Sequence, residues 1–226
     1  MDKRTFVKSV LLGVAGVYAS GLVVKAVKTR KKWDGIFRLP ELPYSPDLLE
    51  PFADAETIKL HLQHHAAYTD GLNAAVSSAG LTGKTAHELL RMASEYPADI
   101  RNYAGGYINH KLFWRVLTPS GKSPSQEFIS LIERDFGSFD AFRKKFSDVA
   151  HSLFGSGWIW LIADTSGKLS ITSTSNHDNP VMDIAEVRGY PVLCLDLWEH
   201  AYSRKNKNRR ADHIDSFWNV VNWNVV

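Results

Sequence analysis

Apolar residues recur at helical spacing through the N-terminal part of the chain, as far as residue 154. In residues 53–79, for example, Ile58, His61, His65 and Leu72 follow one another at intervals that place them on a single helix face. The helices predicted in this way are residues 53–79, 85–97 and 102–117, and two segments within 123–154 that Gly137 separates.

The pattern changes after residue 154. Residues 157–176 alternate and are rich in β-branched side chains, with the turn sequence Asp-Thr-Ser-Gly in their middle, which predicts a β-hairpin. Residues 190–198 predict a third strand, and residues 214–223 predict a closing helix. Residues 41–51 contain three prolines and are expected to form an extended arm. The layout is therefore a helical N-terminal half followed by an α+β C-terminal half.

We expect three parts along the chain. They are an appendage with a basic linker over residues 1–37, a helical domain over 38–120 and an α/β domain over 121–226. The net charge of +3 is unevenly spread between them. Residues 1–32 hold eight basic residues and one acidic residue, a net charge of +7, so the rest of the chain carries −4. The folded body is mildly acidic, which argues against nucleic acid as a partner.

The appendage has the features of a targeting segment. Residues 9–24 are uncharged, which is shorter than the ~20 residues of a membrane-spanning helix and close to the core of a signal peptide. KRTFVK, near the start, resembles a twin-arginine export motif, although the cations after residue 24 favour retention in the cytoplasm. We expect an exported, periplasmic protein or one attached to the membrane through residues 9–24, with a cytoplasmic protein as the alternative.

The predicted third strand ends in Asp-Leu-Trp-Glu-His, although charged groups are seldom fully buried unless they are paired or bind a metal. Asp196 and His200 are four positions apart, which places both on one side of the chain where strand turns into helix. His61 and His110 face inward on their predicted helices. Three imidazoles and one carboxylate suit iron, manganese or zinc, so the sequence predicts a four-ligand metal site.

Six stretches of the chain resemble the iron/manganese superoxide dismutase family, in that family's order and spacing. They are LPYSPDLLEP, HHAAY, AGGYINHKLFW, FGSGWIWL, DLWEHAY and FWNVVNW. The resemblance covers residues 39–226. It implies an α+β fold, with an N-terminal helical hairpin and a C-terminal domain whose three-stranded antiparallel sheet is flanked by helices.

The resemblance also implies a reaction, the disproportionation of superoxide to O2 and H2O2 by an ion that cycles between its +3 and +2 states. One iron or manganese ion per subunit would be bound by solvent and by His61, His110, Asp196 and His200. The metal's reduction potential would depend on the hydrogen bonds made by the groups around these ligands.

Further residues receive roles from the same resemblance. Tyr68 and His64 would gate access to the site and relay protons, while Trp158, Trp160 and Trp198 would surround it with apolar surface.

The same resemblance implies a homodimer through two more residues. Glu199 would reach His200 of the partner subunit, and Tyr202 would meet His64 of the partner subunit. The interface would therefore support the metal site.

The chain departs from the family's pattern at two places. HLQHHAAY is one residue shorter than the usual His-x-x-x-His-His-x-x-Tyr, which predicts a regular helix that keeps His61 and Tyr68 about 20° apart. His177 stands where manganese-type relatives usually have glutamine, and Gly106 stands where iron-type relatives often have it. We expect Gly106 to leave room for the His177 side chain, and His177 favours iron over manganese.

Two other classes of protein share part of this pattern. A non-haem iron oxygenase uses two histidines and one carboxylate, so a fourth protein ligand argues against it. A metal-binding but inactive relative, acting as a surface or interaction protein, would keep the ligands, whereas Tyr68 and His64 favour an active enzyme. The remaining histidines, His87, His151 and His213, are expected at exposed positions without partners.

Overall fold

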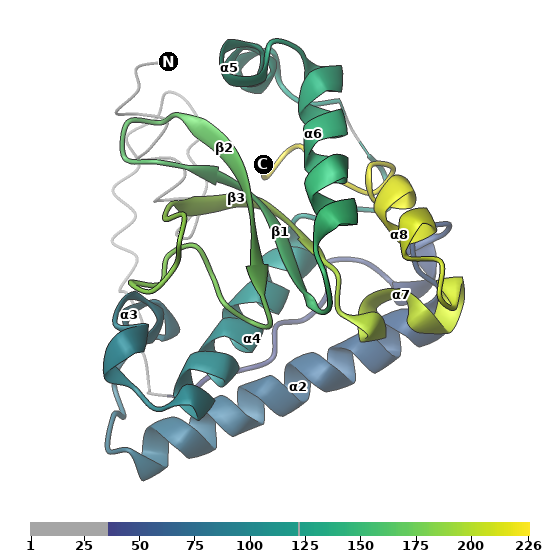
Figure 1. Cartoon of the computed structure of the whole chain (residues 1–226). Helices are drawn as coiled ribbons and strands as arrows, with labels where there is room; N and C mark the ends of the chain where they lie inside the picture. Colours follow the sequence, from purple (N-terminus) through teal and green to yellow (C-terminus); the bar gives the residue numbers. More distant parts are fainter. Residues whose placement is uncertain (1–35, 122) are drawn as a thin grey trace, which may run out of the picture.

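The computed structural model describes residues 36–121 and 123–226. Two long helices, α2 (Ala55–Ser78) and α4 (Ala98–Arg115), pack against each other, and the short α3 (Ala86–Arg91) lies between them in the chain (Figure 1). The Asp54 carboxylate caps α2 by accepting a hydrogen bond from the Thr57 backbone N–H at 2.7 Å. α2 is α-helical throughout, so the shortened HLQHHAAY stretch forms the regular helix that we predicted.

The N-terminal half differs from the prediction in two details. The predicted helix over 85–97 is divided into α3 and the 3₁₀ turn η2 (Ala93–Glu95). The predicted extended arm contains the 3₁₀ turn η1 (Pro46–Leu49), which begins at a proline and buries Leu49. Proline suits the first position of a helical turn because its missing N–H would have no partner there.

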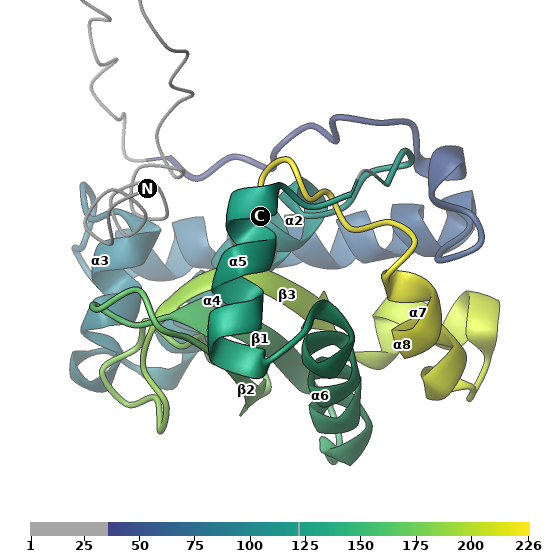
Figure 2. The same cartoon turned by 90° about the horizontal axis from the view of Figure 1, so that it is seen from above.

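Three strands, β1 (Gly157–Ala163), β2 (Leu169–Ser175) and β3 (Tyr190–Asp196), form an antiparallel sheet in the order β2-β1-β3. Every residue of the central strand β1 is buried. On the sheet, α4 packs against β3 and α6 (Phe139–Ser152) packs against β1 and β2, with α5 (Gln126–Phe136) next to α6 (Figure 2). This arrangement confirms the predicted α+β fold.

The C-terminal segment contains two short helices, α7 (Glu199–Asn206) and α8 (Arg210–Phe217). The predicted closing helix over 214–223 is therefore wrong in its extent, because the helix begins earlier and ends at Phe217. Beyond it, the backbone pairs with the segment that follows α4: Thr118 N–H donates to the Val220 carbonyl at 2.7 Å, and Asn222 N–H donates to the Val116 carbonyl at 2.8 Å. These bonds replace the helical ones.

Within residues 36–121 and 123–226, no helix combines the length and apolar character needed to cross a membrane. The predicted signal or anchor segment, residues 9–24, lies outside the described residues, as does almost all of the predicted appendage over 1–37. A larger core cluster surrounds the sheet, and a smaller one lies where α2, α3 and α4 meet.

Candidate metal centre

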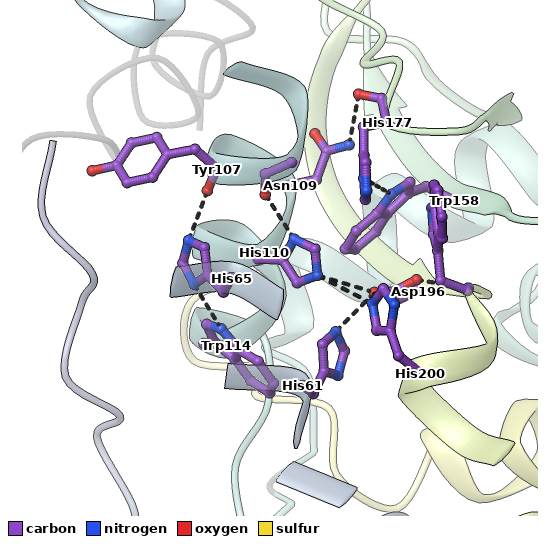
Figure 3. A network of polar contacts seen from close by, with 12 residues as sticks. His61, His65, Tyr107, Asn109, His110, Trp114, Trp158, His177, Asp196 and His200 are labelled. Atoms are coloured by element: carbon purple, nitrogen blue, oxygen red, sulfur yellow. Dashed lines mark hydrogen bonds and ion pairs between the residues drawn. The ribbon is translucent and has the colours of Figure 1, made fainter. Parts of the chain in front are cut away.

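Four side chains converge where α2, α4 and the junction of β3 with α7 meet (Figure 3). They are the four predicted ligands, His61, His110, Asp196 and His200, and their ligand atoms all lie within 4.8 Å of one another. Asp196 Oδ2 lies 2.9 Å from His61 Nε2, 3.4 Å from His200 Nε2 and 3.5 Å from His110 Nε2. The structure thus brings together residues that are up to 139 positions apart in the sequence.

These separations fit one shared metal ion. Nitrogen and oxygen ligands lie about 2.0–2.2 Å from such an ion, so two ligands are about 2.8–3.1 Å apart at a right angle and about 3.5–3.8 Å apart at 120°. The three distances from Asp196 Oδ2, and the 3.4 Å between the Nε2 atoms of His110 and His200, fall within this range. A set of imidazoles with one carboxylate also has the right chemistry for iron, manganese or zinc.

The local sequence explains how β3 delivers Asp196 and His200 together. The strand ends at Asp196, and the Leu197 N–H still donates to the Gly157 carbonyl of β1 at 2.9 Å. The chain then turns, and the Trp198 N–H donates to Asp196 Oδ1 at 2.8 Å. This bond occupies one carboxylate oxygen and leaves Oδ2 directed at the three imidazoles.

Burial and neighbouring groups determine the charges of the site. Burial lowers the pKa of His61 to about 4 and holds the pKa of His110 well below its usual value, so both rings are neutral at pH 7. Burial alone would raise the pKa of Asp196, but hydrogen bonds from His200 and His61 outweigh it and hold that pKa well below its usual range. The site therefore offers an ionised carboxylate and imidazole lone pairs to a cation.

A backbone hydrogen bond fixes the orientation of His110. Its Nδ1–H donates to the Gly106 carbonyl at 2.7 Å, one turn earlier on α4. Because Nδ1 carries the proton, the Nε2 lone pair is free and faces Asp196 and His200. Bonds of this kind are the usual way in which proteins orient a metal-binding histidine.

His65 is a site residue that the sequence analysis did not identify. It is fully buried beside the ligands, and its ring stacks on His110 at a centroid distance of 5.3 Å. Trp114 Nε1–H donates to His65 Nδ1 at 3.1 Å, and His65 Nε2–H donates to the Tyr107 carbonyl at 3.1 Å (Figure 3). Its position on the same predicted helix face as His61 was the available signal.

His177 also lies at the centre and is only 3 % exposed. Trp158 Nε1–H donates to His177 Nδ1 at 3.2 Å. Because an indole nitrogen can only donate, His177 Nδ1 must be the acceptor and Nε2 must carry the hydrogen. This Nε2 has no partner among the described residues. A buried donor without a partner beside the ligands fits a site that receives solvent or substrate.

Tyr68 and His64 lie around the same cluster. The Tyr68 ring stacks on His110 at 5.5 Å and meets His177 edge-on at 4.3 Å, while the half-buried His64 stacks on His200 at 4.3 Å. Burial raises the pKa of Tyr68 to about 12, so its phenol keeps its proton at neutral pH. Burial lowers the pKa of His64.

The expected role of Gly106 is wrong in one respect. A Cβ atom at Gly106 would lie 2.6 Å from Cγ of Tyr68, so the missing side chain makes room for the Tyr68 ring and not for His177. The neighbouring Gly105 accommodates His177, because a Cβ there would lie 2.0 Å from the His177 backbone oxygen. The two glycines therefore make room for different groups, Gly105 for the His177 backbone and Gly106 for the Tyr68 ring.

Two of the three predicted tryptophans contact the cluster directly. The rings of Trp158 and His110 meet at right angles at 5.1 Å, and Trp198 stacks on His177 at 4.3 Å. Trp160 acts one layer further out, since it stacks on Trp158 and its Nε1–H donates to Thr174 Oγ1 at 2.9 Å.

Trp114 is a fourth tryptophan at the site, which the sequence analysis did not include. Its ring meets that of His61 at 4.6 Å, and it is fully buried. It lies near the end of α4, one turn after His110, so helical periodicity could have placed it there.

His213 was expected at an exposed position without a partner, and this expectation is wrong. It is fully buried, and its Nε2–H donates to the backbone carbonyl of Asp196 at 3.0 Å. The register of α8 could not be predicted because its extent was misplaced. By contrast, His151 is exposed as expected, and His87 is half-buried.

The two residues predicted at a subunit interface differ in accessibility. Glu199, directly before His200, is exposed. Tyr202 is 8 % exposed, and its ring lies 5.5 Å from that of His213. Their contacts with a second subunit stay a prediction, as do the gating and proton-relay roles of Tyr68 and His64 and the influence of His177 on the choice of metal.

Comparisons with known proteins agree with this geometry. A family model described as iron/manganese superoxide dismutases, alpha-hairpin domain, matches residues 36–118, and the model of the C-terminal domain of the same family matches residues 124–226. The chain is 47% identical over 194 residues to a protein named superoxide dismutase [Mn] from Acinetobacter baylyi, covering 84% of this chain and 85% of the relative. It is 48% identical over 198 residues to a protein of the same name from Thermus aquaticus, covering 84% of this chain and 95% of the relative. A third such protein, from Listeria innocua, is 48% identical over 194 residues, covering 83% and 94%.

Proposed function

The chain belongs to the iron/manganese superoxide dismutase family, and on this premise we propose how its residues carry out the reaction and which metal they use. It is a superoxide dismutase. Within the molecule, this assignment rests on one observation. Four side chains converge, and their ligand atoms lie within 4.8 Å of one another.

The ion is held by His61, His110, Asp196 and His200. When bound, it supplies the one-electron oxidation and reduction that convert superoxide to O2 and H2O2. His110 binds through Nε2 because its Nδ1–H is engaged by Gly106, and Asp196 binds through Oδ2 because its Oδ1 accepts from the Trp198 N–H. These bonds hold the donor atoms in place before the ion arrives.

We propose manganese as the ion. The relatives from Acinetobacter baylyi, Thermus aquaticus and Listeria innocua, at 47–48% identity, are all named for manganese. This proposal replaces the preference for iron that we drew from His177. The geometry of His177 is compatible with manganese. Trp158 fixes His177 as an Nε2–H donor, and the glutamine amide that is usual at this position is also a donor.

The protons consumed in forming H2O2 are handled by three side chains beside the ligands. Tyr68 and His177 contact each other, and each holds a proton at neutral pH, on the phenol oxygen and on Nε2 respectively. His64 is half-buried and stacks on the ligand His200, so it is reached from solvent and touches the site. We assign Tyr68 and His177 to proton supply and His64 to its replenishment.

The enzyme is proposed to be a homodimer in which Glu199 and Tyr202 contact the partner subunit. The support is an exposed surface next to the site. Phe154 is 99% exposed, which is unusual for a large apolar side chain. The Leu197 N–H donates to the Gly157 carbonyl, so the segment after Phe154 runs beside the segment before Glu199. A second copy would cover both.

For localisation we propose export or membrane attachment through the appendage, on the strength of the KRTFVK motif and the uncharged residues 9–24. Cell fractionation with an antibody against the folded body tests this. A processed protein outside the cytoplasm, or an intact protein in the membrane fraction, is expected. Intact protein in the soluble cytoplasmic fraction would contradict both versions.

The choice of metal is tested by stripping the purified protein and reloading it with manganese or iron. Bound metal and superoxide turnover are then measured on the same samples. We expect one ion per subunit with either metal and a higher turnover per bound ion with manganese. Higher turnover with iron would contradict the proposed metal, and no turnover with either would contradict the proposed function.

A further inference from the structure

The backbone carbonyl of Asp196 is held by a side chain from a different helix. His213, on α8, donates its Nε2–H to this carbonyl at 3.0 Å, and both groups are fully buried. The carbonyl oxygen can only accept, so His213 must carry its proton on Nε2. His213 Nδ1 has no partner among the described residues, so the bond to Asp196 is the one hydrogen bond that its ring makes there.

Two aromatic rings pack against the His213 ring. Phe52 stacks on it at 4.6 Å with an interplanar angle of 26°, and Tyr202 lies 5.5 Å away at 34°. Its helix is fixed by Ile214 and Phe217, both buried in the larger core cluster. These contacts leave little freedom to the ring, so the direction of the Nε2–H bond is set by packing and not by the carbonyl alone.

Asp196 stands at the last position of β3, where the pairing with β1 ends. It is anchored on two sides, since α8 donates to its carbonyl through His213 and the start of α7 donates to its Oδ1 through the Trp198 N–H. Rotation of the peptide plane after Asp196 is limited by the first bond on its carbonyl side and by the Leu197 N–H bond to Gly157 on its other side. Rotation of the carboxylate is limited by the second bond. Together they direct Oδ2 toward the three histidines.

We propose that His213 is a positioning residue for the metal ligand Asp196. Without the Nε2–H donor, a buried carbonyl would lack a partner, which protein interiors avoid strongly. The peptide plane would then be held only by the Leu197 N–H bond to Gly157, so it would tilt about that bond, and the Asp196 side chain would tilt with it. The expected consequence is weaker retention of the ion, with the ligands themselves unchanged. This inference rests on the metal site proposed above.

The test compares substitutions that differ in the donor. In His213→Gln, the amide nitrogen occupies nearly the place of Nε2 and can donate to Asp196. In His213→Met, a side chain of similar length has no donor, and in His213→Asn the amide is too short to reach the carbonyl. The metal-loaded holoenzymes are mixed with excess EDTA, and the release of the ion is followed over time, together with the absorption spectrum of the oxidised centre.

Loss of groups that orient metal ligands typically changes metal affinity 10–100-fold. We therefore expect the Met and Asn variants to release metal roughly ten-fold faster than the wild type. The Gln variant should release it at nearly the wild-type rate. Phe217→Leu, on the same helix, controls for packing and should lower the melting temperature without faster release. Equal rates of metal release in the Gln, Met and Asn variants would overturn the inference. If the Met variant does not fold, the comparison of the Gln and Asn variants decides between the two outcomes. A wild-type protein that binds no metal would overturn the proposed function along with it.

Discussion

Replacing Gly106 by alanine should disable the enzyme while leaving it folded. The added Cβ atom would lie 2.6 Å from Cγ and 2.7 Å from Cδ1 of Tyr68. These atoms are at the root of the ring, where a small change of side-chain torsion moves them little. Carbon atoms in contact need about 3.5 Å, so the ring must retreat by roughly 0.9 Å. Tyr68 also contacts His177 and His110, so the movement disturbs the groups around the metal.

The two consequences of this substitution differ in size. Overpacking costs about 1–3 kcal/mol, but alanine is favoured over glycine inside a helix by about 1 kcal/mol. The net loss of folding free energy is therefore about 0–2 kcal/mol, which lowers the melting temperature by at most about 8 °C in a protein of this size. A misplacement of about 1 Å at a reacting centre can cost up to 10²-fold in rate. We expect turnover to fall at least about ten-fold.

The assay is superoxide turnover per bound metal, measured beside thermal unfolding. Gly71→Ala is the matched control, because its Cβ would lie 2.6 Å from Cε1 of Tyr103, at the far end of a ring that packs against the smaller core cluster. The control should lose some stability and keep its turnover. Wild-type turnover in Gly106→Ala, or an equal loss of turnover in both variants, would refute the reasoning.

Three further predictions address the interface, the metal and pH. Glu199→Ala should weaken the dimer and lower activity together, and a monomer by light scattering with full activity would refute this coupling. His177→Gln should raise turnover with manganese relative to iron, because a stronger amide donor favours the oxidised state; an unchanged ratio in reconstituted samples would show that His177 does not tune the metal. Burial lowers the pKa of His65 and of His213 to about 4, against about 6.5 in the unfolded chain. The metal-free protein should therefore be most stable above pH 6.5 and lose roughly 1.4 kcal/mol per pH unit for each histidine as pH falls toward 4. Urea unfolding at several pH values measures this slope, and a flat profile would contradict it.

The sequence allowed the ligands to be predicted because each lies in a strong local pattern. His61 and His110 occupy the apolar faces of long helices, and Asp196 and His200 flank a sharp change from strand to helix. Periodicity identifies such positions, since a helix face or a strand end is defined by residues within a few positions of one another. The family resemblance then joined the three segments into one site.

The groups around the ligands could not be predicted in the same way. Gly106 makes room for Tyr68 from α2, and only the packing of the two helices shows which ring fills that space. His213 required the correct limits of α8, and the residues beyond Phe217 look helical in sequence but pair with the segment after α4. Both cases depend on contacts between distant segments, on which the local pattern gives no information.

Four side chains hold one metal ion, and superoxide is dismutated at that ion. This role of the four residues is tested most directly by replacing each of them by alanine, in His61→Ala, His110→Ala, Asp196→Ala and His200→Ala, and by measuring metal content and superoxide turnover on the same samples. We predict one ion per subunit and rapid turnover in the wild type, and loss of the ion or of turnover in every variant. Full metal content with normal turnover in any one of the four would contradict the site described here.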